Sequence, residues 1–151
     1  MDDKVWDKLN RQAEADPPSE SDRDPYDIAL DKGYSVIASH PSMLQVDLDT
    51  PRTQKQEGAL LIFLQWLGGH GRLVTTSPGG NKHEYYRVDA RMSRMERMAL
   101  QLALGSDPKR ELLNHLRPAR PMVLFETAEE AARVRAWWAA GEPKEEDDVA
   151  F

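Results

Sequence analysis

Two aspartates stand two residues apart in the segment MLQVDLDTP, residues 43–51. Its apolar and polar residues alternate, which predicts a strand with the two leucines and the valine on one face. Asp47 and Asp49 then share the other face, roughly 6.5 to 7 Å apart. Aspartate is uncommon in strands, so two aspartates in one strand indicate that the site requires them. Two carboxylates at this spacing can bind one hard divalent ion or bridge two ions in phosphoryl transfer.

Four further side chains could complete such a site. Glu126 ends the short apolar segment 121–126 and supplies a third oxygen ligand if that segment lies beside the aspartates. His83 follows a glycine-rich loop and could hydrogen-bond a phosphate, with Lys82 and Arg87 nearby. Each feature also has a plainer explanation: the wet face of an exposed strand, an incidental histidine, an acid at a helix entry and an ordinary hairpin loop.

The elements that position these residues follow from hydrophobic period, caps and turn residues. Two hairpins are expected, strand 34–39 with strand 43–49 and strand 72–77 with strand 83–89, followed later by strand 121–126. Helices are expected from Tyr26 to Gly33, from Pro51 to Gly68, over 93–104, over 108–117 and over 128–138. After the first helix the order is β-β-α-β-β-α-α-β-α. This order predicts an α+β fold: a mostly antiparallel sheet of about five strands with helices packed largely on one face, as in ferredoxin-like folds.

Cap residues set the expected helix boundaries. Thr50 caps the second helix with Pro51 at its first position, and Gly68 ends it. Asp107 caps a later helix, again with proline at the first position. Thr127 with glutamate three residues on predicts a capping box for the last helix.

Composition limits the classes of protein. The chain has 151 residues, a net charge of -6 and no cysteine, so disulfides and thiolate zinc sites are excluded. No apolar segment approaches the roughly 20 residues that span a bilayer, and no secretory signal is found, so we expect a cytoplasmic protein without membrane contact. Residues 1–25 are expected to be a mobile acidic arm, 26–141 a single α+β domain and 142–151 an acidic disordered tail.

Positive charge gathers in one block of an otherwise acidic chain. Residues 91–120 contain seven basic and three acidic side chains. The block could face nucleic-acid phosphates, or it could be a solvated helix surface. Its candidate nucleic-acid-binding residues are Arg91, Arg94, Arg97, Lys109 and Arg110.

The chain resembles the archaeo-eukaryotic primase superfamily, in particular its compact phage and plasmid members. Val46-Asp47-Leu48-Asp49 matches the apolar-Asp-apolar-Asp motif, Asn81-Lys82-His83 loosely matches the small-x-His motif, and Phe125-Glu126 is the candidate third motif, with glutamate in place of the usual aspartate. Residues 100–113 also resemble a segment of phage primase-like proteins. The resemblance covers roughly residues 33–127.

The resemblance implies a catalytic site. Asp47, Asp49 and Glu126 would hold Mg²⁺ or Mn²⁺, and His83, Lys82 and Arg87 would bind a nucleoside triphosphate. The implied function is a primase-polymerase that adds nucleotides to the 3'-hydroxyl of DNA, single-stranded or as a primed template, during phage or mobile-element replication.

The C-terminal residues 145–151 form an acidic run that ends in an aromatic residue. They resemble the tails of bacterial single-stranded DNA-binding proteins, which implies that Asp147, Asp148 and Phe151 bind host replication proteins. A solubilising tail is the alternative.

Two other functions remain open. A non-catalytic DNA-binding or replication-adaptor protein would use the basic block and the tail, and its binding would be indifferent to divalent ions. A phage structural or regulatory protein would use neither the basic block nor the tail for binding.

Overall fold

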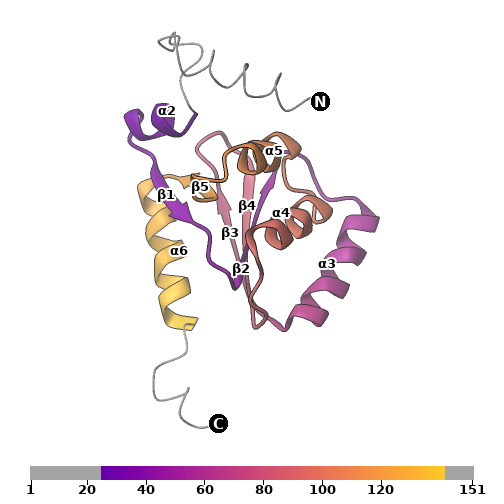
Figure 1. Cartoon of the computed structure of the whole chain (residues 1–151). Helices are drawn as coiled ribbons and strands as arrows, with labels where there is room; N and C mark the ends of the chain where they lie inside the picture. The colour runs from indigo at the N-terminus through magenta and orange to yellow at the C-terminus, as the bar shows by residue number, and fades with distance from the viewer. Residues whose placement is uncertain (1–24, 142–151) are drawn as a thin grey trace, which may run out of the picture. The chain divides into compact units, whose positions relative to one another are not determined.

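The computed structural model describes residues 25–141. The chain divides into two units, Met1–Lys32 and Gly33–Phe151. In the first unit the described element is helix α2 (Pro25–Asp31). The described elements of the second unit, labelled in Figure 1, are β1 (Ser35–Ala38), β2 (Met43–Leu48), α3 (Gln54–Leu67), β3 (Gly69–Thr76), β4 (Lys82–Val88), α4 (Arg94–Ala103), α5 (Pro108–Leu116), β5 (Val123–Glu126) and α6 (Ala128–Gly141). The fold is α+β, and the expected order of elements is confirmed.

The strands form two antiparallel sheets, so the expectation of a single five-stranded sheet is wrong. One sheet has the order β2-β4-β3, and the other pairs β1 with β5. The second expected hairpin is confirmed as β3 and β4. The first is wrong, because β1 and β2 belong to different sheets.

The link between β1 and β2 explains why no hairpin forms there. Ser39 N donates to Met122 O (2.8 Å) and so extends the contact between β1 and the chain before β5. Three residues later, Ser42 O accepts from Val88 N (3.0 Å), beside β4. The chain therefore changes sheets within residues 39–42 instead of folding β2 back onto β1.

The three-stranded sheet has a core on each face. Leu44, Val46, Tyr86 and Val88 point to the face that α3 and α4 cover, where Leu60 and Leu104 complete the cluster. Met43 and Tyr85 point to the opposite face, against Leu124 of β5 and Ala131 and Val134 of α6. Figure 1 shows α6 alongside β1 and β5, with α3 and α4 on the other side of the sheet. Helices therefore lie on both sides of the three-stranded sheet rather than largely on one.

Helix boundaries follow the caps, with one correction. Helix α3 begins at Gln54, not Pro51, because Thr53 forms a capping box with Gln56: Gln56 N donates to Thr53 Oγ1 (3.2 Å), and Thr53 N donates to Gln56 Oε1 (2.8 Å). The predicted ends at Gly68 and the Asp107 cap before Pro108 are confirmed.

Candidate metal centre

A row of polar side chains crosses the three-stranded sheet. Asp47 on β2 is in register with His83 on β4, and His83 is in register with Thr75 on β3. These side chains share the face that carries Tyr85, against which β5 packs. The polar row therefore meets the other sheet at Glu126, the last residue of β5.

His83 is buried between two carboxylates. Its Nε2 lies 3.3 Å from Asp47 Oδ1, and its Nδ1 contacts Glu126 Oε1. Burial alone would lower the pKa of His83, but the hydrogen bonds to Asp47 and Glu126 raise it above its usual value. The charged imidazolium donates from both nitrogens, so it matches two flanking acceptors.

Glu126 is fully buried among polar side chains. Its Oε1 accepts from Thr75 Oγ1 (3.0 Å) and from the Tyr85 hydroxyl (2.9 Å), besides its contact with His83. Among residues 25–141, its Oε2 has no hydrogen-bond partner. Burial, and then the charge of Glu126, raises the pKa of Tyr85. Tyr85 therefore keeps its proton and remains a donor to Glu126.

The segment between α4 and α5 hydrogen-bonds the backbone of Asp47 along the edge of β2 that no described strand covers. The Asp47 N–H donates to Ser106 Oγ (3.1 Å), and the Asp47 carbonyl accepts from Asp107 N (2.8 Å). Ser106 in turn donates to the buried Glu111 (3.0 Å). These bonds place the Asp107 side chain next to the aspartate pair.

Asp47, Asp49 and Asp107 each offer a carboxylate oxygen, and the three oxygens lie within 4.8 Å of one another. Partial burial first, and then the charges of Asp107 and Asp47, raise the pKa of Asp49, while Lys109 lowers it. Three acids that repel one another at this spacing fit a hard divalent cation, which binds oxygen ligands and would neutralise them. The residue set therefore suits Mg²⁺ or Mn²⁺.

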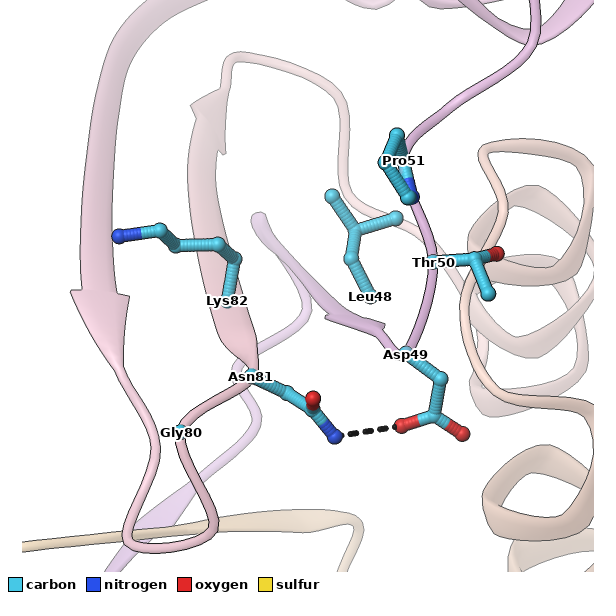
Figure 2. A pocket seen from close by; sticks show the side chains of 7 residues that line it. All are labelled: Leu48, Asp49, Thr50, Pro51, Gly80, Asn81 and Lys82. Carbon is cyan, nitrogen blue, oxygen red and sulfur yellow. Dashed lines mark hydrogen bonds between the residues drawn. The ribbon is translucent and has the colours of Figure 1, made fainter.

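A pocket of about 340 Å³ opens beside these acids. It is lined by Leu48, Asp49, Thr50, Pro51, Gly80, Asn81 and Lys82, which Figure 2 shows. Asn81 Nδ2 donates to Asp49 Oδ1 (2.9 Å) and fixes that carboxylate from the loop side. The Lys82 side chain runs away from Asp49 in Figure 2, and its Nζ contacts Thr76 Oγ1 (3.4 Å). The volume lies within the range of small-molecule sites.

Three other residues singled out from the sequence, Glu126, Arg87 and Arg110, do not line the pocket. Glu126 does not join the three aspartates, because it lies behind His83 on the buried side of the sheet. Arg87 stacks on α6, with its Cζ 4.0 Å from the Trp138 ring centroid, and does not line the pocket. Arg110 is bound to Gln45 O (2.9 Å) and to Glu111. Its guanidinium is therefore committed to protein partners.

The basic candidates on α4 and before it remain at the surface. Arg91 is exposed, and Arg94 and Arg97 are half-buried. Lys109 is exposed and close enough to Asp49 to lower its pKa, so it belongs to the acidic site. Asp147, Asp148 and Phe151 lie outside the described residues.

The sequence did not identify Asp107 as a site residue, although it identified the same residue as a helix cap. The cap brings the α5 entry to the edge of β2, and no local pattern shows that contact. Thr75 and Tyr85 were missed in the same way, because their role depends on β5 packing against β4.

Comparison of the chain with protein-family models, curated proteins and solved structures finds no match. The described helices include none of the length and apolar character needed to cross a membrane.

Proposed function

We propose that the second unit binds a nucleoside triphosphate with Mg²⁺ or Mn²⁺ and adds nucleotides to a DNA 3'-hydroxyl, as an α+β primase-polymerase of the archaeo-eukaryotic primase type acting in the cytoplasm. The convergence of Asp47, Asp49 and Asp107 carries the proposal. The contacts of His83 with Asp47 and Glu126 support it, because residues of all three primase-like motifs meet although they are far apart in sequence.

The aspartates would hold the ions at the mouth of the pocket. Bound ions would activate the 3'-hydroxyl and neutralise the leaving pyrophosphate as the new bond to the α-phosphorus forms. Asn81 orients the Asp49 carboxylate, and His83 holds Asp47 from the buried side. Lys82 would reach a triphosphate after a change of rotamer from its present contact with Thr76.

Glu126 takes a different part in this site from the third-motif acid of the family. It contacts the imidazole of His83, and two hydroxyl groups fix it. Asp107, whose carboxylate lies within 4.8 Å of those of Asp47 and Asp49, would take its place as the third acid that holds the ions. In this proposal Glu126 is a positioning residue, and it orients the imidazole that supports Asp47.

Calorimetric titration with Mn²⁺ and dATP tests the proposal. The Asp47→Asn/Asp49→Asn double variant should lose metal-dependent nucleotide binding, and Asp107→Asn should weaken it. Asparagine caps helices as well as aspartate does, so Asp107→Asn removes a charge and keeps the cap. Asp89→Asn, an exposed acid at the end of β4, is the matched control and should bind as the wild type does.

Thermal denaturation separates loss of the site from loss of the fold. Mn²⁺ should raise the melting temperature of the wild type but not that of the double variant, since a ligand stabilises only the state that binds it. Wild-type nucleotide binding by the double variant would refute the site. A non-catalytic adaptor predicts no metal-dependent nucleotide binding in any form of the protein.

A further inference from the structure

Helices α4 and α5 face each other along two rows of polar residues. Gln101 Nε2 on α4 donates to both carboxylate oxygens of Glu111 on α5 (3.1 Å each). Residues three and four apart share a helix face, so Arg97 and Arg94 continue the row from Gln101, and Asn114 continues the row from Glu111. The contact of Arg94 Nη2 with Asn114 O (2.8 Å) confirms that these ends of the rows meet. We name Arg94, Arg97 and Asn114 the donor strip.

Each side chain of the donor strip has a buried N–H group without a partner. Within residues 25–141 these are Arg94 Nε, Arg97 Nε and Asn114 Nδ2. Buried polar groups in folded proteins are nearly always hydrogen-bonded, because leaving one unpaired costs its hydration. Three unpaired donors between the same two helices therefore point to an acceptor that binds there.

The charges of the donor strip are also uncompensated. Arg94 donates to the carbonyls of Asn114 and Arg117, and Arg97 donates to the carbonyl of Met92 (2.7 Å). In the described part of the chain neither guanidinium forms an ion pair. Burial, and then the charge of Arg94, lowers the pKa of Arg97.

The dipole of α4 adds to the positive potential around Arg94 and Arg97. Both arginines lie in the first turns of α4, where the helix dipole disfavours cations. The acid in the first turn of α4, Glu96, is used in the helix cap, where it accepts from Ser93 N (3.3 Å). An anion bound at the donor strip would relieve the repulsion and satisfy the unpaired donors together.

We infer that the donor strip binds a backbone phosphate of single-stranded nucleic acid. Guanidinium groups present planar pairs of N–H donors that match phosphate oxygens, and the Asn114 amide adds an uncharged donor. Arg91, three residues before Arg94, is exposed and adds a positive charge near the start of α4, which suits a chain of phosphates better than a single ion. The identity of the chain rests on the proposed function. The anion site itself rests on the unpaired donors.

Fluorescence anisotropy with a labelled 20-residue oligo-dT, in EDTA and without nucleotide, tests the inference. Arg97→Gln should raise the dissociation constant about tenfold and reduce the slope of log affinity against log salt by about 0.7. Lys55→Gln removes the same charge from the exposed first turn of α3 and should change the affinity far less. Equal loss in both variants would mean that only net charge matters and would overturn the site.

A second variant separates loss of oligonucleotide binding from loss of folding. Asn114→Asp places a carboxylate among the unpaired donors, so it should raise the melting temperature while weakening oligonucleotide binding. Unchanged binding in Asn114→Asp and Arg97→Gln would overturn the inference. Competition by inorganic phosphate as strong, per phosphate, as that by unlabelled oligo-dT would assign the site to free phosphate and would equally overturn it. Because EDTA removes the ions, these outcomes are distinct from a failure of metal-dependent nucleotide binding.

Discussion

At the scale of single residues, Glu84 on β4 is a buried carboxylate held by two arginines. Arg52 and Arg72 both contact it, and the Tyr86 hydroxyl donates to it (2.7 Å). Burial alone would raise the pKa of Glu84, but the hydrogen bonds from Arg52 and Tyr86 hold it below its usual value. The ionised form therefore stabilises the fold above the unfolded pKa, about 4.3, and this stability is lost as pH falls through the folded pKa.

Glu84→Gln should lower the free energy of unfolding at pH 7 by about 3 kcal/mol, because it leaves the buried Arg52 with only the exposed Glu57 as an ion-pair partner. The difference from the wild type should shrink below about pH 4. Urea denaturation at both pH values measures it. The control is Glu57→Gln, an exposed acid 3.6 Å from the same arginine, which should cost no more than about 0.5 kcal/mol. Equal costs for the two variants would contradict the prediction.

At the scale of elements, the turn between α4 and α5 depends on Gly105. Its φ is +95°, a left-handed conformation, and an added Cβ would lie 3.2 Å from the Gln56 side chain. Gly105→Ala should destabilise the protein by about 1 to 2 kcal/mol. Gly58→Ala, in the interior of α3 with open space around it, should instead stabilise by about 1 kcal/mol. Thermal denaturation measures the change in stability of both variants. Changes of the same sign would contradict the conclusion that the turn requires glycine at position 105.

Element boundaries were the most predictable part of the fold, since they depend on local chemistry. Asp107 caps the helix expected of it, and Gly68 ends α3. The start of α3 was misplaced because two threonines could cap it, and the capping box with Gln56 decides for Thr53. The pairing of β1 was not predictable, because its partner is set by packing of distant segments rather than by the turn beside it.

The candidate site shows the same limit. The period of two placed Asp47 on the face opposite Leu44 and Val46, where it pairs with His83. The carboxylates of Asp47 and Asp49 lie close together, although β2 ends before Asp49. Asp107 and Glu126 depend on tertiary contacts, the first with the edge of β2 and the second with β4. Sequence alone therefore predicted the strand that carries Asp47 but not the contacts that bring Asp107 and Glu126 to it.

At the scale of the whole second unit, Arg110 links the two sheets. Its guanidinium donates to Gln45 O on β2 (2.9 Å) and to Val123 O on β5 (3.3 Å), and it contacts the buried Glu111. Arg110→Gln should lower the free energy of unfolding by about 3 kcal/mol, because Glu111 loses its charge partner. Lys109→Gln, next to it but exposed, should cost less than about 0.5 kcal/mol. Urea denaturation measures the free energy of unfolding of both variants. A small effect of Arg110→Gln would contradict the prediction and leave Arg110 available as a nucleic-acid-binding residue.

The pairing of β1 with β5 also orders events during synthesis. Residues 35–38 find their partner only when residues 123–126 have been made, on the order of ten seconds later at ordinary translation rates. Until then the nascent chain can pair β2, β4 and β3, but His83 and Tyr85 lack the strand that brings Glu126 to them. The three-stranded sheet can therefore form before β5 is made, and its polar row stays open until Glu126 packs against it.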